Sequence, residues 1–292
     1  MQRRIFVLIA LLAAVFGALG GYIGAQVQKT DALSAFAPRE TAYERIMRTR
    51  TIRCGYFVWP PFTVKDPNTG VLSGFNSDFM EMLGKALDLK IEWTQDLNFG
   101  TYLQDLADGR YDMECSTGWP NAKRGQRAYF AKPFAFMPLV ALVRADDTRF
   151  DQDLSLINAP SVSVATIDGE TSSVIHDTKF PQAGQMSLPS NSPVSDIILN
   201  VVSHKADVTF LDIVAARQYE ENNLDKVKIL NPEHPISMIA LGPTLPQDDR
   251  TKQMIDIAID QLQNSGQIEA LLKKYEDKNG SLFLRVNASY QH

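Results

Sequence analysis

An arginine and two hydroxyl residues follow a short apolar stretch near position 115. The segment STGWPNAKR, residues 116–124, begins with Ser116 and Thr117 and ends with Arg124. A guanidinium presents five N–H donors in a planar fork that matches a carboxylate, and hydroxyls can add further donors. A solvated arginine beside Lys123 is the simpler alternative. We predict that this loop holds the carboxylate of a small molecule.

Polar and aromatic residues also follow other predicted strands. Asp212 comes directly after the apolar segment ADVTFL, where an acid either caps a helix or meets a ligand cation. In DGETSS, residues 168–173, Thr171 or Ser172 can cap the next helix and leave backbone N–H groups for an anion. Trp59, before two prolines, offers a rigid flat face, although a core aromatic is the alternative. If the two halves of the chain form facing lobes, the arginine of one half and the aspartate of the other would suit a zwitterionic ligand.

The elements that must position these loops alternate between strand and helix. In the first half, the patterns predict alternating elements in chain order. These are a helix at 41–47, a strand at 51–57, a helix opened by Asn76, a strand at 89–93, a helix at 102–107 and a strand at 111–115. The second half predicts strands at 161–165, 206–210 and 226–230, with helices between them. This alternation predicts an α/β fold with parallel sheets, whose ligands bind at the carboxyl ends of the strands.

Two extended apolar segments, 137–145 and 235–242, join the two halves and predict a hinge of two strands. Two amphipathic helices, 249–264 and 267–275, end the pattern and should pack on the first lobe. The expected domains are lobe 1 from residues 40–140 with 238–292, and lobe 2 from 141–237.

The N-terminal segment has a different character. Two arginines precede residues 5–25, which carry no charge and would span about 31 Å as a helix. We therefore expect a membrane anchor or signal segment at 1–27 and a tether at 28–39, with the body outside the cytoplasm. A cleaved signal peptide, giving a secreted form, is the alternative.

Composition excludes some classes of function. The 292 residues are 45% hydrophobic and 22% charged, with a net charge of -5 and no long basic run, which argues against a nucleic-acid partner. The histidines are isolated, so we expect no metal and no other cofactor. Cys54 and Cys115 lie in predicted strands, and both a disulfide and free buried thiols fit an exported protein.

At the level of motifs, the sequence resembles the periplasmic solute-binding proteins of polar amino acid ABC transporters over nearly all of residues 40–278. The matching stretches are WPPF, LSGFNSDFMEMLGKAL, LADGRYDMECSTG, KRGQRAYFAKPF, KADVTFLDIVAARQY and AIDQLQNSGQIEALLKKYE. The resemblance implies a two-lobed type II fold that closes on an amino acid. It also implies that Arg124 binds the carboxylate, Asp212 binds the ammonium, Trp59 stacks on the side chain, and Thr171 completes the carboxylate site.

Some positions depart from that pattern. Trp119 stands where the family usually has Ser or Thr near the ammonium, which removes a hydroxyl and narrows the pocket. Glu170 stands in the place of the first of two threonines and adds a negative charge near the site. Asn76 replaces an Asp, which we expect to cap its helix equally well. Tyr56 stands where receptors for basic amino acids tend to carry an acid, so lysine and arginine are not the favoured ligands, although Glu170 could restore a cation site.

The expected function is an extracytoplasmic receptor that binds an amino acid or related small carboxylate and serves an inner-membrane permease. We expect it to be no enzyme. The main alternative is a periplasmic dehydratase acting on prephenate or arogenate, with Glu170 as the general acid. A further alternative is an accessory or sensory binding module that delivers no solute.

Overall fold

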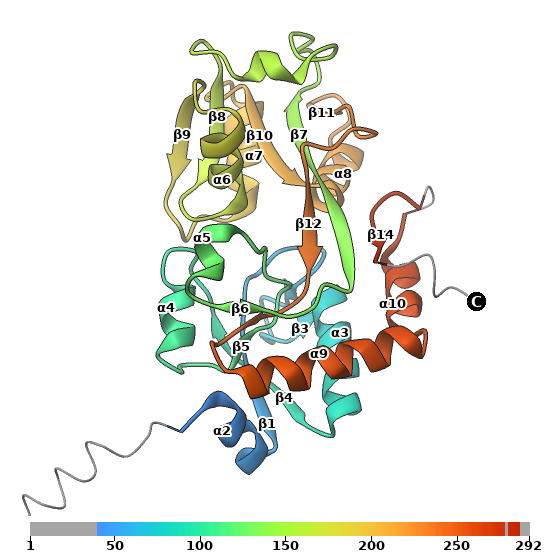
Figure 1. Cartoon of the computed structure of the whole chain (residues 1–292). Helices are drawn as coiled ribbons and strands as arrows, with labels where there is room; N and C mark the ends of the chain where they lie inside the picture. The colour runs from blue at the N-terminus through green and yellow to red at the C-terminus, as the bar shows by residue number, and fades with distance from the viewer. Residues whose placement is uncertain (1–39, 278–279, 287–292) are drawn as a thin grey trace, which may run out of the picture. The chain divides into compact units, whose positions relative to one another are not determined.

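The computed structural model describes residues 40–277 and 280–286. From Ala42 onward the chain builds two lobes, each around its own sheet (Figure 1). In the described ranges no helix is both long and apolar enough to cross a membrane. The expected membrane segment at residues 5–25 lies outside the described residues.

Lobe 1 is built around a five-stranded sheet. Its strand order is β4, β1, β5, β13, β6, with bounds Lys90–Asp96, Thr51–Tyr56, Met113–Glu114, Thr244–Leu245 and Tyr129–Phe130. The strands β4, β1 and β5 are parallel, as predicted, but β13 pairs antiparallel with both β5 and β6. The sheet is therefore mixed, because the chain re-enters lobe 1 after its second crossing and adds β13 in the opposite direction.

The helices of lobe 1 are α2 (Ala42–Thr49), α3 (Phe75–Leu87), α4 (Tyr102–Ala107), α5 (Ala122–Gly125), α9 (Asp249–Asn264) and α10 (Gln267–Tyr275). As predicted, α9 and α10 return to pack against α3 in this lobe. The expectation for Asn76 is wrong, since α3 begins after Gly74 and no side chain caps it. The Asn76 amide is buried and donates to the Thr63 hydroxyl at 2.9 Å. A short hairpin of β2 (Val64–Lys65) and β3 (Leu72–Ser73) precedes this helix.

Lobe 2 is built around the larger sheet, which has the strand order β11, β7, β10, β8, β9. Its strands are β7 (Ala135–Arg144), β8 (Ser163–Ile167), β9 (Gly184–Leu188), β10 (Val208–Asp212) and β11 (Val227–Leu230). The helices α6 (Thr171–Lys179), α7 (Val194–Val202) and α8 (Ile213–Asn222) pack against them, and a 3-10 turn, η1 (Leu154–Ile157), precedes β8. Here too the sheet is mixed, because β7 enters from lobe 1 antiparallel to β10 and β11.

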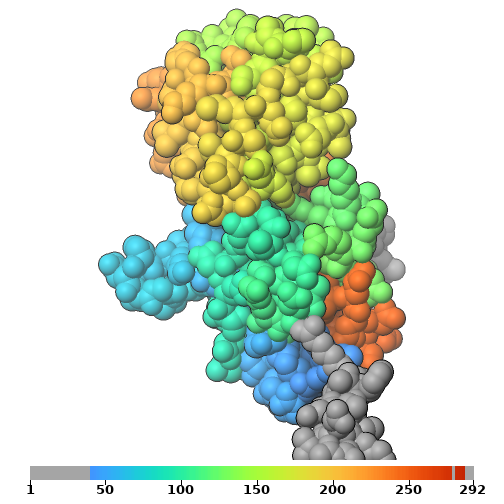
Figure 2. All heavy atoms as spheres, turned by 90° about the vertical axis from the view of Figure 1, so that its left-hand side faces the viewer, coloured from blue at the N-terminus to red at the C-terminus, as the bar shows by residue number. Residues whose placement is uncertain are grey.

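The connection between the lobes consists of paired strands. β7 runs beside β12 (Ser237–Leu241) in antiparallel register, from Ala135 opposite Leu241 to Leu139 opposite Ser237 (Figure 1). A short strand near the end of the chain, β14 (Leu284–Arg285), also pairs with β7. Figure 2 shows lobe 2, in yellow and orange, resting on the teal and green part of lobe 1. The predicted domain boundaries remain predictions.

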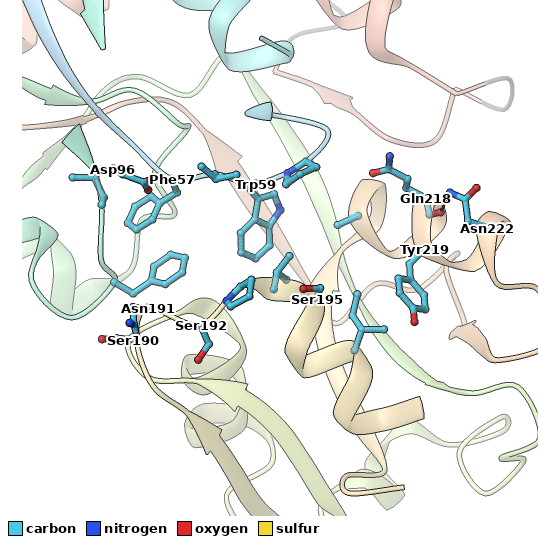
Figure 3. A pocket seen from close by; sticks show the side chains of 18 of the residues that line it. Phe57, Trp59, Asp96, Ser190, Asn191, Ser192, Ser195, Gln218, Tyr219 and Asn222 are labelled. Atoms are coloured by element: carbon cyan, nitrogen blue, oxygen red, sulfur yellow. Dashed lines mark hydrogen bonds between the residues drawn. The ribbon is translucent and has the colours of Figure 1, made fainter. Parts of the chain in front are cut away.

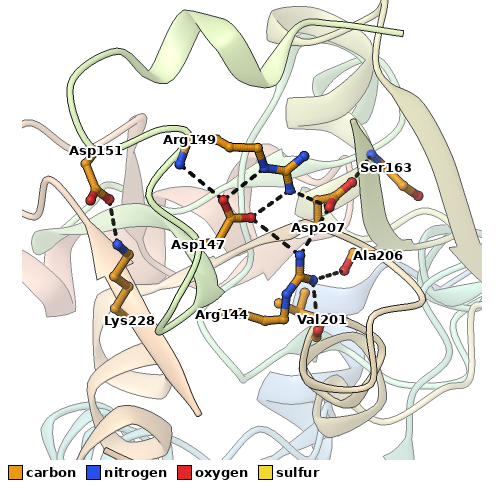
Figure 4. A network of polar contacts seen from close by, with 9 residues as sticks. All are labelled: Arg144, Asp147, Arg149, Asp151, Ser163, Val201, Ala206, Asp207 and Lys228. Carbon is orange, nitrogen blue, oxygen red and sulfur yellow. Dashed lines mark hydrogen bonds and ion pairs between the residues drawn. The ribbon is translucent and has the colours of Figure 1, made fainter. Parts of the chain in front are cut away.

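An ion-pair network joins segments of lobe 2 at the far end of β7 (Figure 4). Asp207 accepts from Arg149 at 2.5 Å and from Arg144 at 3.3 Å, and Asp147 accepts from Arg149 at 2.7 Å. The Asp207 carboxylate also accepts from the backbone N–H of Ser163. The hydrogen bond from Arg149 is the largest cause that lowers the pKa of Asp147. We assign this network a structural role, because its carboxylates and guanidinium groups pair with one another.

Candidate functional site

Arg124 lies where the lobes meet, in the short helix α5. The Asn121 side chain caps this helix by accepting from the Arg124 N–H at 3.0 Å. The Arg124 side chain is 8% exposed and donates to the Trp119 carbonyl at 2.7 Å and to the Gly169 carbonyl of lobe 2 at 2.6 Å. Its guanidinium carbon also lies 5.6 Å from the centre of the Tyr102 ring. A buried cation thus bridges the lobes through neutral carbonyl oxygens.

Asp212 ends β10 and caps α8, so the two alternatives left open for this acid are compatible. Its carboxylate accepts from the Ala215 N–H at 2.8 Å and from the Trp59 indole N–H at 2.7 Å. Trp59 belongs to lobe 1, so this bond also joins the lobes. Burial raises the pKa of Asp212, and these donated hydrogen bonds oppose the rise.

Glu170, and not Thr171 or Ser172, caps α6. Its carboxylate accepts from the Ser172 N–H at 2.6 Å and from the Ser172 hydroxyl. The residue is fully buried, and burial raises its pKa against the effects of these donors and of the nearby Arg124 charge. Thr171 lies beside a different cavity, of about 210 Å³, with Trp119 and the hinge strand β12. The structure therefore does not bring Thr171 to the Arg124 cavity.

The cavity at Arg124 is small. It has a volume of about 40 Å³, and Trp59, Ser116, Thr117 and Trp119 line it together with Arg124. A bound water needs roughly 10–15 Å³ of such space, so there is room for a few waters but not for an amino acid. These five predicted residues are brought together here.

The two hydroxyls of this loop already have local partners. Ser116 Oγ accepts from the Phe57 N–H at 2.7 Å, so its own hydrogen stays available for donation. Thr117 donates its hydroxyl to the Ser116 carbonyl and has a positive φ of 60°. The prediction that Ser116 or Thr117 adds a donor therefore fits Ser116 better.

Glu114 is a buried acid that the sequence reasoning did not select. It accepts from the Thr244 hydroxyl at 2.8 Å and from the Ser116 N–H at 2.5 Å, and it is 0% exposed. Burial raises its pKa, while these hydrogen bonds and the Arg124 charge lower it. Gly118 passes so close that an added Cβ would lie 1.9 Å from Thr244 Oγ1. An acid within the apolar segment YDMEC was the available signal.

An aromatic wall was also missed. Phe57 stacks on Phe99 with ring centres 4.2 Å apart, and Trp59 meets Phe99 edge to face at 6.4 Å. Trp59 also meets Trp119 edge to face, with ring centres 5.0 Å apart. We call Phe57, Trp59 and Phe99 the aromatic wall, because they line both the small cavity and a larger groove of about 550 Å³. Phe99 follows β4 at the carboxyl edge of the sheet, a position that the loop rule could have identified.

The two cysteines form a disulfide. Cys54 in β1 is bonded to Cys115, directly after β5, with the Cα atoms 5.5 Å apart. Cys115 immediately precedes Ser116. The disulfide therefore fixes the start of the Arg124 loop to the strand that leads to Trp59.

Comparisons with known proteins identify the family to which this chain belongs. Residues 52–278 match the model for bacterial extracellular solute-binding proteins, family 3. The cyclohexadienyl dehydratase of Pseudomonas aeruginosa is 23% identical over 226 residues, covering 77% of this chain and 82% of the relative. The amino-acid-binding protein AabA of Dichelobacter nodosus is 28% identical over 218 residues, covering 70% of this chain and 80% of the relative.

Among solved structures, one similar fold is the ancestral amino acid-binding protein AncCDT-1, described as a precursor of cyclohexadienyl dehydratase. It has a TM-score of 0.70 at 23% identity and covers 80% of this chain and 99% of its own. The family match and the similar solved structure both agree with the two-lobed fold described above. Because the family model spans well over half of the sequence, the chain belongs to the bacterial extracellular solute-binding proteins of family 3.

Proposed function

We propose that this protein is an extracytoplasmic receptor that binds an amino acid or related small carboxylate between its lobes and serves an ABC transporter. The observation that carries the proposal is the buried Arg124 guanidinium, which the carbonyls of Trp119 and Gly169 hold from opposite lobes. A buried cation is most stable beside an opposite charge. A ligand carboxylate at this position would replace neutral acceptors with a charged, bidentate one.

The Asp212 carboxylate would serve the other end of a zwitterion. Burial raises its pKa, and a ligand ammonium would favour the ionised form. Since the Arg124 cavity has only about 40 Å³, the lobes must separate to admit a ligand. Opening would break the links from Arg124 to Gly169 and from Trp59 to Asp212, and closure on a ligand would replace them.

The test is ligand-induced stabilisation of the purified full-length chain, measured by thermal denaturation with amino acids and small dicarboxylates. A ligand at 100 times its Kd should add about 2.7 kcal/mol to the free energy of unfolding. Arg124→Ala should abolish this gain, because losing one member of a buried charge pair costs roughly 2–5 kcal/mol of binding. Arg127→Ala, which changes an exposed arginine three residues after Arg124, is the matched control. Equal stabilisation of wild type and Arg124→Ala would refute the proposal.

A dehydratase is the second candidate, because burial holds the pKa of Glu170 above its usual range near Arg124. A carboxyl whose pKa is raised keeps its proton to higher pH and can donate it to a departing hydroxyl. The similarity to a cyclohexadienyl dehydratase points the same way. Purified protein incubated with prephenate or arogenate distinguishes the two functions. Turnover that is abolished by Glu170→Gln, while ligand binding persists, would establish the enzyme. No turnover by the wild-type protein would favour the receptor.

For location, we propose that the folded body lies outside the cytoplasm, as the family description indicates, and that residues 5–25 act as a membrane anchor or an export signal. The partner would be an inner-membrane permease, and an accessory or sensory module without transport is the remaining alternative. Cell fractionation of the full chain tests the tether. Release of the body into the soluble periplasmic fraction would favour a cleaved signal.

A further inference from the structure

A larger groove, drawn in Figure 3, shares the aromatic wall with the Arg124 cavity. Its volume is about 550 Å³, within the range of about 300–1,000 Å³ that is usual for small-molecule sites. Phe57 and Trp59 from lobe 1 face Ser192 and Ser195 from lobe 2, and Gln218 and Tyr219 of α8 stand at the other end. The role proposed for Arg124 and Asp212 does not account for this space.

The groove is not a gap left by separated lobes. The lobes are joined around it by the bond from Trp59 to Asp212 and by contacts of the loop after β4. In that loop the Phe99 N–H donates to the Ser190 carbonyl at 3.3 Å, and the Ser190 hydroxyl donates to Asn98 at 2.9 Å. The groove therefore remains when the lobes are in contact, as a built feature of the closed arrangement.

The lining of the groove is nearly free of charge. Asp96 is its one charged residue, and Lys65 pairs with it at 3.4 Å. Serines, asparagines, a glutamine and a tyrosine supply the polar groups, and the aromatic wall and two prolines supply flat apolar surface. A cationic or anionic ligand group would lose its hydration here without gaining a free opposite charge.

Several of these polar groups have unused hydrogen-bonding capacity. The side chains of Ser192, Ser195 and Gln218 have no hydrogen-bond partner within residues 40–277 and 280–286. The amides of Asn222 and Asn223 donate to carbonyls one turn earlier in the chain, at 2.7 and 2.9 Å, which leaves their oxygens to accept. The groove thus offers donors and acceptors together, beside aromatic faces.

We infer that the ligand carries, beyond its carboxylate end, a bulky uncharged polyhydroxylated group, such as a sugar, which occupies this groove. A sugar presents hydroxyls to the amides and serines, and C–H faces to the aromatic wall, with no charge to desolvate. This inference rests on the proposed function for the carboxylate end. It assigns the groove to the ligand class of an amino acid joined to a carbohydrate.

The experiment is calorimetric titration of the full-length chain with L-serine, O-β-D-glucosyl-L-serine and L-arginine. We expect glucosyl-serine to bind at least tenfold more tightly than serine, about 1.4 kcal/mol. Gln218→Ala should lower the affinity for glucosyl-serine severalfold and leave that for serine unchanged. Glu221→Ala, on the same helix but outside the groove, should change neither.

The outcomes separate the inference from the proposed function. Equal affinities for serine and glucosyl-serine, both lost in Arg124→Ala, would overturn the inference and support the receptor. Tightest binding of arginine would overturn the inference in favour of a cationic side chain. Glucosyl-serine bound equally by wild type and Arg124→Ala would support the groove and refute the carboxylate site. Binding of none of the three would overturn the inference.

Discussion

The Cys54–Cys115 disulfide gives the sharpest prediction of stability. It closes a loop of 61 residues in sequence separation, and both cysteines are buried, Cys54 within β1 and Cys115 directly after the neighbouring strand β5. The chain-entropy relation assigns about 4 kcal/mol to a loop of this length. At about 2–4 °C per kcal/mol for a chain of this size, the double variant Cys54→Ala/Cys115→Ala should melt roughly 8–16 °C below wild type.

The assay is thermal denaturation monitored by circular dichroism. Each protein is unfolded and refolded either with or without a reductant before it is melted. Reduced wild type should melt near the double variant, and the reductant should not change the variant itself. The ligand affinity should fall as well, because the disulfide fixes the loop that carries Arg124 to the strand that leads to Trp59. A double variant that melts within about 2 °C of wild type would correspond to roughly 1 kcal/mol or less instead of about 4 kcal/mol, and would refute the reasoning.

Gly118→Ala should destabilise the protein by about 1–3 kcal/mol, because its Cβ would overlap the threonine hydroxyl that serves Glu114. Gly125→Ala, with no heavy atom within 4 Å of the added Cβ, is the control, and equal urea midpoints would contradict the prediction. Glu114→Gln should change the pH dependence of stability. Burial raises the pKa of Glu114, so the native protein keeps this proton where the unfolded chain, with a pKa of about 4.3, has lost it. Its contribution to the free energy of unfolding therefore falls as pH rises through that window, and urea titrations should show that fall in wild type but not in the variant.

The order of elements was predictable because local patterns determine it. The helices α9 and α10 have the predicted bounds, since Asp248 caps the first and Gly266 separates them. The antiparallel strands were not predictable in the same way. β13 and β6 have two residues each, which is too short for a periodic pattern, and their pairing depends on where the chain re-enters lobe 1.

The site was predictable to the extent that it follows the strand-end rule. Arg124, Asp212 and Trp59 were selected because each follows a strand at the carboxyl edge of a sheet. The family comparison confirms the resemblance that linked them, and their roles in ligand binding stay predictions. Glu114 was missed because a buried acid is recognisable only from its partner, and Thr244 lies 130 residues further along the chain. Pairings over such separations leave no local pattern in the sequence.

Trp119 contacts both Arg124 and the aromatic wall, and local sequence patterns did not reveal these contacts. Its carbonyl accepts from the Arg124 guanidinium, and its ring meets Trp59 edge to face, so the same residue contacts both the cation and the aromatic wall. Trp59 in turn donates its indole N–H to Asp212 Oδ2, while Asp212 Oδ1 accepts from the backbone of α8.

A ligand ammonium must therefore share Asp212 with the Trp59 indole or displace it, and displacement would move a ring that borders both the Arg124 cavity and the groove. Recognition of the charged end of a ligand would then alter the shape of the space for its other end. We propose that this coupling would let one set of lobes bind a zwitterionic group and still select the larger group attached to it.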